Sequence, residues 1–155
     1  MTIRGSQRIE EFTGDHAREI LKTNKESQNF TEQQIEYAVS FYQMKGNKSY
    51  TLIVDEVPVL CGGIVNQGFG NGEVWIFMSG LFFTKYKILC HRTLKKAFRV
   101  LAKEMKLKRV QALIDMEIHS PINEKWIKSF GFEPEGIMKK YGINNEDYYR
   151  YARLF

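Results

Sequence analysis

Cysteine, proline and histidine are scarce in this sequence of 155 residues, which contains two cysteines, three prolines and three histidines. Cys61 and Cys90 show neither a metal-ligand spacing nor a disulfide pattern, so the sequence predicts two reduced thiols. His16, His91 and His119 are too scattered along the chain to form a zinc-binding set. The sequence therefore predicts no metal site and no disulfide framework.

Long apolar runs are also missing. The longest run, Val57 to Val65, is far shorter than the roughly 20 residues that a membrane-spanning helix needs. The first residues, Met1 to Gly5, lead into no apolar signal-peptide core. A serine nucleophile motif of the type Gly-x-Ser-x-Gly is absent as well. We therefore expect a cytoplasmic protein without a membrane partner.

The composition is that of a globular domain, with 43% hydrophobic, 14% aromatic and 26% charged residues. A chain of this length buries about 70% of its unfolded surface, so we expect a single domain over residues 1–155. The 23 basic and 18 acidic residues give a formal net charge of +5. Many of the basic residues lie between Lys85 and Arg109. They form either a solvated helix face or a binding patch.

The N-terminal third predicts one strand and two helices. Residues 3–12 form the strand, and Thr13-Gly14-Asp15 begins the first helix. A polar connector over 22–29 follows. Thr31 and Gln34 then have the spacing of a capping box, in which each side chain satisfies a free backbone N–H group at the start of the second helix.

Three strands follow. Residues 50–54 and 57–65 are apolar and rich in β-branched side chains, and Asp55-Glu56 between them indicates a tight hairpin. Residues 66–72 are rich in glycine. A phosphate-binding glycine loop must open a helix, whereas this segment leads into a strand over 74–78. The sequence therefore predicts a hairpin loop there.

The clearest helical periodicity comes next. Apolar residues recur every three or four positions, at Leu94, Ala97, Phe98, Leu101, Ala102 and Met105. An apolar strand over Arg109 to Asp115 follows this helix. A strand, a helix and a strand in this order predict that the strand over 74–78 and the strand over 109–115 are parallel.

The C-terminal part predicts a short helix and a hairpin. Ser120 and Pro121 have the residue types of an N-cap and a first helical position, and Gly131 ends the helix. The predicted buried edge consists of Ile122, Trp126 and Phe130. Strands over 136–141 and 147–154 close the chain. The predicted fold is α/β, with a mixed sheet that is antiparallel at its start, parallel in its middle and closed by a C-terminal hairpin, and with helices on both faces.

The segment from Trp126 to Gly136, with its Gly131-Phe132 pair, resembles the GNAT superfamily of N-acetyltransferases. The run Gly136-Ile137-Met138-Lys139-Lys140-Tyr141-Gly142 matches the strand that follows this pair in the superfamily. Trp75, the stretch 83–94 and the Tyr148-Tyr149-Arg150-Tyr151 ending are similar to small acetyltransferase-like proteins of short-tailed phages, among them an internal virion protein family.

The resemblance implies that the chain binds acetyl-CoA. In the superfamily, the pyrophosphate sits on backbone amides at the start of a helix, after a loop that contains glycines. Placing the helix by its apolar stripe puts this loop on residues 86–91, which contain no glycine. The candidate cofactor-binding residues are Tyr86, Lys87, Ile88, Leu89, Cys90, His91 and Arg92. The basic residues would contact phosphates directly; alternatively, Ile88 to Cys90 pack inward and the basic side chains are only solvated.

The resemblance also implies a tyrosine acid four residues before the glycine of the Gly-Phe pair, and that position is Ile127. Isoleucine cannot transfer a proton. The candidate catalytic residues are therefore Asp115 and His119, which follow the end of a parallel strand, where ligands of α/β sheets gather. A capping carboxylate and a solvated histidine are their structural alternatives.

Two functions follow as expectations. The first is an acyl-CoA-dependent N-acetyltransferase that acts on an amine. The second is a catalytically degenerate phage protein in the virion or in the host cytoplasm, where it binds a protein partner. Stacking of bases on Tyr148, Tyr149, Tyr151 and Phe155 is an alternative use of the C-terminal aromatic residues. Burial of Tyr149, Tyr151 and Leu154, or of their neighbours, by strand alternation explains them more simply, so we expect no nucleic-acid partner.

Overall fold

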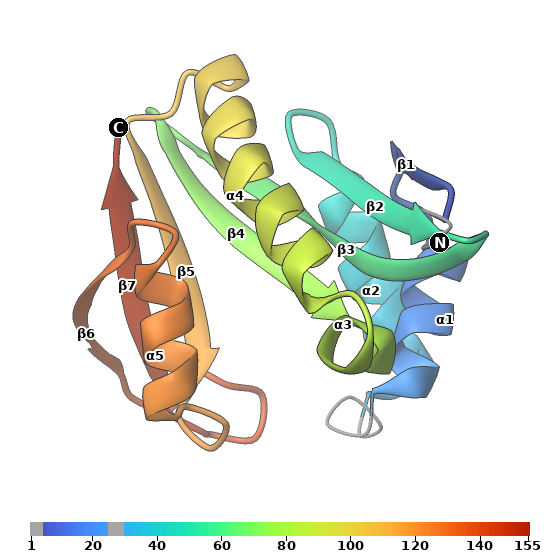
Figure 1. Ribbon diagram of the computed structural model, residues 1–155. Coiled ribbons are helices and arrows are strands. Elements are labelled where there is room, and N and C mark those ends of the chain that lie inside the picture. The colour runs from blue at the N-terminus through green and yellow to red at the C-terminus, as the bar shows by residue number, and fades with distance from the viewer. Residues whose placement is uncertain (1–4, 25–29) are drawn as a thin grey trace. The chain divides into compact units, whose positions relative to one another are not determined.

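The computed structural model describes residues 5–24 and 30–155. Within them, the elements follow one another as β1 (Gln7–Glu11), α1 (Gly14–Thr23), α2 (Glu32–Tyr42), β2 (Lys48–Val54), β3 (Val57–Gly68), β4 (Asn71–Met78), α3 (Gly80–Thr84), α4 (Lys87–Glu104), β5 (Arg109–Asp115), α5 (Pro121–Lys128), β6 (Glu133–Met138) and β7 (Tyr148–Leu154) (Figure 1). The strand order in the sheet is β1-β2-β3-β4-β5-β7-β6. β4 and β5 are parallel, and β1–β2, β2–β3, β5–β7 and β6–β7 are antiparallel. The predicted α/β class and mixed sheet are confirmed.

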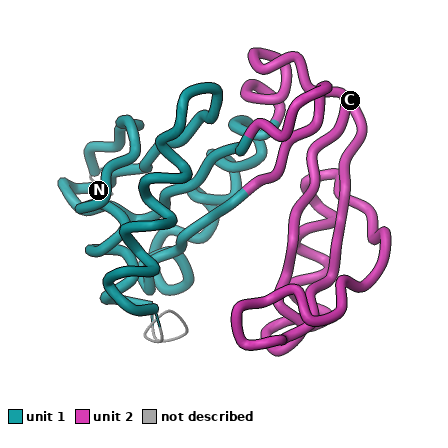
Figure 2. The backbone as a smooth tube through the Cα atoms, turned by 180° about the vertical axis from the view of Figure 1, so that it is seen from behind, with its two compact units in different colours: residues 1–65, 75–98 teal, residues 66–74, 99–155 magenta. Residues whose placement is uncertain are grey.

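The chain divides into two compact units, each built from two stretches of sequence (Figure 2). Unit 1 consists of residues 1–65 and 75–98, and unit 2 consists of residues 66–74 and 99–155. Strand β4 therefore begins in unit 2 and ends in unit 1, whereas strand β3 and helix α4 each begin in unit 1 and end in unit 2.

The first two helices of unit 1 begin where side-chain caps predict. The Thr13 hydroxyl accepts a hydrogen bond from the His16 backbone N–H at 3.3 Å. The predicted capping box is complete: Thr31 Oγ1 accepts from the Gln34 N–H at 3.1 Å, and Gln34 Oε1 accepts from the Thr31 N–H at 2.9 Å. The described strand β1 starts at Gln7, and residues 3–4 and 25–29 of the predicted strand and connector lie outside the described part.

The predicted Asp55-Glu56 turn is confirmed, because both residues have positive φ, at 50° and 66°. The predicted loop over 66–72 is wrong in length. β3 continues to Gly68 and β4 starts at Asn71, so only Phe69 and Gly70 connect the two strands. The φ angles of Gly68, Phe69 and Gly70 are 84°, 53° and 78°, which reverses the chain within two residues.

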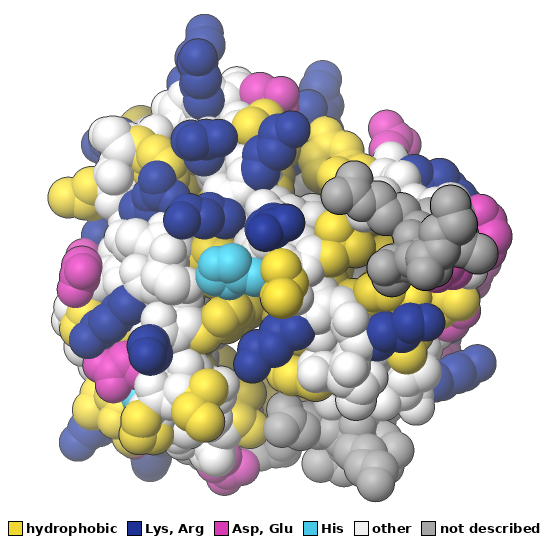
Figure 3. All heavy atoms as spheres, viewed as in Figure 1, with side chains coloured by type: hydrophobic (Ala, Val, Ile, Leu, Met, Phe, Trp, Pro, Cys, Tyr) yellow, Lys and Arg dark blue, Asp and Glu magenta, His cyan; other side chains and the backbone are white. Residues whose placement is uncertain are grey.

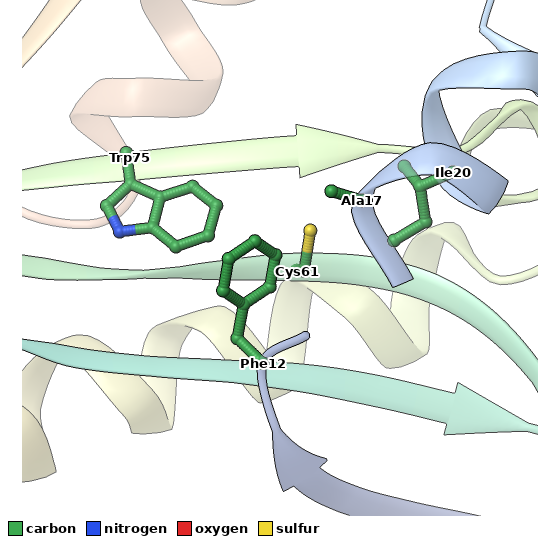
Figure 4. Packing of buried hydrophobic residues seen from close by; sticks show 5 residues of the cluster. All are labelled: Phe12, Ala17, Ile20, Cys61 and Trp75. Carbon is green, nitrogen blue, oxygen red and sulfur yellow. The ribbon is translucent and has the colours of Figure 1, made fainter. Parts of the chain in front are cut away.

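The core of unit 1 is an aromatic cluster around Trp75. The indole ring stacks on Tyr42 with a centroid separation of 3.8 Å and an interplanar angle of 2°, and Phe12 and Phe77 meet it edge-on. Figure 4 shows Ala17 and Ile20 of α1 beside this cluster. Helix α2 contributes Tyr42 and Val39, so α1 and α2 together cover this face of the strands.

The apolar stripe of α4 is confirmed. Cys90, Leu94 and Phe98 are buried in the part of the helix that belongs to unit 1, and Leu101 and Ala102 are buried in the part that belongs to unit 2. Because these residues recur every three or four positions, one side of the helix is apolar and the opposite side is exposed.

In unit 2, helix α5 begins as predicted, with the Ser120 hydroxyl accepting from the Asn123 N–H at 3.2 Å and Pro121 in the first turn. Its predicted buried edge is partly wrong. Ile122 is 76% exposed, whereas Ile127 and Phe130 are buried. The φ of Gly131 is 88°, a conformation that suits a glycine after a helix end.

The C-terminal hairpin differs from the prediction in two ways. Its first strand, β6, runs from Glu133 to Met138 and so starts and ends three residues earlier than predicted. Its second strand, β7, pairs with β5 as well as with β6 and therefore lies between them. Tyr151 is buried as predicted for this strand, but Leu154 is 74% exposed, because strand alternation places it on the face opposite to that of Tyr151.

Candidate functional site

The predicted phosphate-binding segment begins a helix rather than preceding one. After β4, the chain forms the short helix α3, which the sequence did not predict, and α4 then begins at Lys87. The Cys90 N–H donates to the Tyr86 carbonyl at 2.9 Å, so Tyr86 closes the first turn. Residues 87–92 therefore lie inside α4 and not in a loop before it.

The side chains of this segment point in different directions. Lys87, Ile88 and Arg92 are exposed, whereas Cys90 is completely buried. The Tyr86 hydroxyl donates to Asp55 Oδ2 in the β2–β3 turn at 3.2 Å. Tyr86 thus joins α4 to a turn that lies 31 residues earlier in the sequence, a structural role that the sequence did not indicate.

The start of α4 has the chemistry of an anion site. The backbone N–H groups of residues 87–89 have no acceptor within the helix, because the first turn of any helix lacks them. This turn contains no acidic residue, and the helix dipole is positive there. Lys87 and Arg92 add two exposed cations. These groups suit a diphosphate. The segment contains no glycine, so no position gives the diphosphate oxygens closer access to the backbone.

Burial removes Cys90 from the list of reactive groups. It raises the pKa of the Cys90 thiol to about 12, and burial also raises the pKa of the Cys61 thiol. A thiol that stays protonated is a poor nucleophile. Cys90 therefore serves as a small apolar residue that anchors the first turn of α4.

This burial gives a prediction on pH and reactivity. The native protein should not react with a thiol reagent at pH 8, whereas both thiols should react in denaturant. Because the folded pKa of Cys90 lies above its ordinary value of 9.0, unfolding releases a proton above pH 9, and stability should fall between pH 9 and about 12. A Cys90→Ala variant should lose less stability over this range. Rapid labelling of the native protein at pH 8 would contradict the assignment.

The two predicted catalytic residues, Asp115 and His119, belong to unit 2. They frame the turn between β5 and α5, where the His119 N–H donates to the Asp115 carbonyl at 3.0 Å. The Asp115 carboxylate accepts from the Glu117 N–H at 2.9 Å, which is the capping role given above as its alternative. Across the sheet, Asp115 pairs with Tyr148, and the pKa of that phenol is raised by burial and, to a smaller extent, by the charge of Asp115.

The side chain of His119 lies on the other face of this sheet. Its Nε2 is 2.8 Å from the Tyr151 hydroxyl, and its ring centroid is 4.2 Å from that of Tyr149. Because Tyr148 and Tyr149 are consecutive strand residues, they point to opposite faces. The structure therefore joins Asp115 and His119 through the backbone but separates their side chains.

His119 forms a pair with Tyr151 that the sequence did not reveal. Tyr151 is almost completely buried, and its pKa is raised by burial and by the charge of Glu124. Glu124 itself pairs with Lys128 along α5 at 2.9 Å. A hydrogen-bonded histidine and tyrosine can exchange a proton along the bond. No spacing in the sequence indicates this pair, since 32 residues separate its members.

Two further positions have clear structural roles. Ile127, at the position where the resemblance implies an acid, is buried in α5 and carries no titratable group. Glu73 of β4 accepts hydrogen bonds from Gln111 at 2.6 Å and from Gln67 at 3.1 Å.

A cavity of about 310 Å³ lies in unit 1. It is lined by Phe12, Tyr42, Tyr50 and five polar or charged residues, and it contains none of the predicted site residues.

The surface over α4 is rich in Lys and Arg side chains (Figure 3). Within the described residues, no three His, Cys, Asp or Glu side chains gather closely enough to hold a metal ion. In the same part of the chain, no helix is long and apolar enough to cross a membrane.

No family model matches the chain, and no curated protein is significantly similar to it in sequence. Many solved structures match its fold. An acetyltransferase of the GNAT family from Bacillus anthracis is 19% identical, with a TM-score of 0.69, and the match covers 99% of this chain and 98% of that one. An acetyltransferase from Streptococcus agalactiae is 13% identical, with a TM-score of 0.74 and coverages of 96% and 98%.

A third match is a variant of spermidine N-acetyltransferase from Vibrio cholerae. It is 12% identical to this chain, with a TM-score of 0.71, and the match covers 95% of this chain and 94% of that one. All three matches span nearly the whole length of both chains. The chain therefore has the fold of the GNAT acetyltransferases.

Proposed function

We propose that this protein is an acyl-CoA-dependent N-acetyltransferase. The observation that carries the proposal is the match of nearly the whole chain to the fold of known acetyltransferases. The start of α4 supports it, because free backbone N–H groups and two exposed cations suit the diphosphate of coenzyme A. The acceptor is an amine, the group on which an N-acetyltransferase such as the spermidine enzyme acts.

When bound, acetyl-CoA supplies an acyl thioester that an amine nitrogen can attack, with the coenzyme thiol as leaving group. Lys87 and Arg92 would bind the diphosphate by charge-assisted hydrogen bonds. Backbone N–H groups of β4 beyond Glu73, the last residue that pairs with β5, would polarise the acyl oxygen. The Ser79 N–H is not available for this role, because it donates to the Val59 carbonyl at 3.0 Å.

Proton transfer is assigned to His119 and Tyr151. A histidine side chain can take the proton that the attacking amine loses, and the bond to Tyr151 fixes the position of one ring nitrogen. Asp115 would hold the turn that carries His119 rather than move a proton itself. Because Ile127 cannot donate a proton, the departing thiolate must be protonated by another group or by water.

Acetyl-CoA should raise the melting temperature of the protein. At a concentration of 100 times the dissociation constant, a ligand that binds only the folded state adds about 2.7 kcal/mol. For a chain of this length, the midpoint should rise by roughly 5 to 11 °C. A nucleotide without the pantetheine arm should give a smaller rise. If millimolar acetyl-CoA did not change the melting temperature, the proposal would be contradicted.

The Lys87→Ala/Arg92→Ala double variant should raise the dissociation constant for acetyl-CoA. The matched control is Lys125→Ala/Lys139→Ala, which removes the same charge from exposed lysines that are not part of α4 and should bind normally. If the two double variants bound acetyl-CoA with equal affinity, the start of α4 would not be part of the cofactor site. If only the α4 double variant binds more weakly, an assay of free thiol release with different amines would identify the acceptor.

A second candidate is a GNAT-fold protein without catalysis. Two observations favour it: the missing glycines at the start of α4 and the buried Ile127 at the acid position. The resemblance to phage proteins would then place it in a virion or in the host cytoplasm, bound to a protein partner. A stable complex or a fixed copy number in purified particles, combined with no response to acetyl-CoA, would favour this candidate over the enzyme.

A further inference from the structure

Helix α4 carries the whole net charge of the chain. It contains six basic residues and one acidic residue, a difference of five, which equals the formal net charge of +5. The other residues therefore balance to zero. The charged side chains of the helix are Lys87, Arg92, Lys95, Lys96, Arg99, Lys103 and Glu104.

Four of the basic residues form a stripe that begins after the proposed diphosphate site. We call Lys95, Lys96, Arg99 and Lys103 the basic stripe; all four are exposed. Each helical residue turns by about 100° and rises by 1.5 Å, so the four lie within a sector of about 100° and extend over about 12 Å. α4 is one continuous helix, and this spacing follows from the helix alone.

The basic stripe has no partner within the described part of the chain. Every arginine described outside α4, namely Arg8, Arg18, Arg109, Arg150 and Arg153, makes an ion pair or a hydrogen bond. Neither arginine of α4 makes one with residues 5–24 or 30–155, and the same is true of the three lysines of the stripe. Apart from Glu104, every acidic residue of the chain lies outside α4.

Like charges within the stripe repel one another. Lys95 and Arg99 are four residues apart, as are Arg99 and Lys103, and such pairs of equal sign destabilise a helix. A polyanion on this surface would reverse that cost. The stripe is therefore complementary to a partner with regularly repeated negative charge.

We propose that the basic stripe binds the phosphate backbone of double-stranded nucleic acid without reading its sequence. A stripe of cations along a helix, in a chain with a pI of about 9.1, is the electrostatic pattern of phosphate binding. Single strands need aromatic side chains on which bases stack, and the one aromatic ring of α4 besides histidine, Phe98, is buried. A protein partner would instead favour an interface depleted in lysine at its centre.

The basic stripe contains none of the C-terminal tyrosines, for which base stacking was the alternative to burial in a strand. Phosphate contacts from the stripe require no stacking. The proposal also does not depend on acyl transfer, because none of the four residues belongs to the proposed diphosphate site.

The test is the salt dependence of binding to a fluorescent 20-base-pair DNA duplex, followed by anisotropy. Four phosphate contacts predict a slope of log K against log salt of about −3.6, so affinity should fall about 150-fold between 50 and 200 mM NaCl. Lys95→Gln/Arg99→Gln should reduce this slope by about 2. The matched control Lys125→Gln/Lys139→Gln has the same net charge and should retain the slope.

Three results would overturn the proposal. One is the absence of saturable binding to the duplex at 50 mM NaCl. Another is an equal loss of slope in both double variants, which would assign binding to net charge and not to the stripe. The third is displacement of the duplex by polyglutamate as effectively as by unlabelled duplex at equal charge concentration, which would identify an acidic protein surface as the partner. Melting curves of both variants would verify that they are folded.

Discussion

A Trp75→Ala variant is expected to lose about 3 to 5 kcal/mol of unfolding free energy, the usual cost of removing a buried large aromatic side chain. Trp75 is 8% exposed and contacts three other aromatic rings, those of Phe12, Tyr42 and Phe77. The substitution leaves a cavity among rings that come from α2, from β4 and from Phe12, the residue that follows β1. For a chain of this length, the melting midpoint should fall by about 6 to 20 °C.

The matched control for this variant is Phe69→Ala. Phe69 is 95% exposed in the β3–β4 turn, so its removal should change stability by less than about 0.5 kcal/mol. Trp75→Phe should lose less than Trp75→Ala, because it keeps a ring in the cluster. It also removes an indole N–H that has no partner within the described residues. Similar midpoints for Trp75→Ala and Phe69→Ala would contradict the role of this cluster as the core of unit 1.

A Gly63→Ala variant should be destabilised by about 3 kcal/mol, the upper part of the range for overpacked sites. A Cβ atom at Gly63 would overlap the backbone oxygen of Lys48 and lie 2.8 Å from its carbonyl carbon and 2.9 Å from the Cα of Ser49. All three are backbone atoms of β2, which pairs with β3 at this point. No side chain can rotate away, so the two strands must separate.

Urea denaturation would measure this loss, with Gly14→Ala as the control for the same chemical change. A Cβ atom at Gly14 would meet Arg18 Nη1 at 2.9 Å, which is the end of a flexible side chain. That variant should differ from the parent by less than about 1 kcal/mol. If Gly63→Ala were equally mild, β2 and β3 would have to be less closely paired than the structure shows.

The sequence predicted features that depend on neighbouring residues. The Thr31–Gln34 capping box, the Asp55-Glu56 turn and the apolar stripe of α4 are all decided within one or two helical turns or within a turn of the chain. The sequence did not predict the five-residue helix α3, because its short length leaves no period to detect. The exposure of Ile122 was missed because burial depends on what packs against each face of the helix.

The candidate site was less predictable than the fold. The chemistry at the start of α4 followed from the positions of Lys87 and Arg92, but the contact between Tyr86 and Asp55 joins residues 31 positions apart. The His119–Tyr151 pair likewise forms only when β7 inserts beside β5. Insertion of a late strand between earlier ones is decided by tertiary packing, which no local spacing records.

The division of the chain into two units limits how the protein can be dissected. Because β3, β4 and α4 each pass from one unit to the other, neither unit is a continuous segment of sequence. A fragment that starts at Arg99 lacks residues 71–73, the part of β4 that pairs with β5, and would leave an unpaired strand edge. Truncation should therefore give aggregation-prone fragments, and the smallest folding unit to express is one that keeps all three crossings intact.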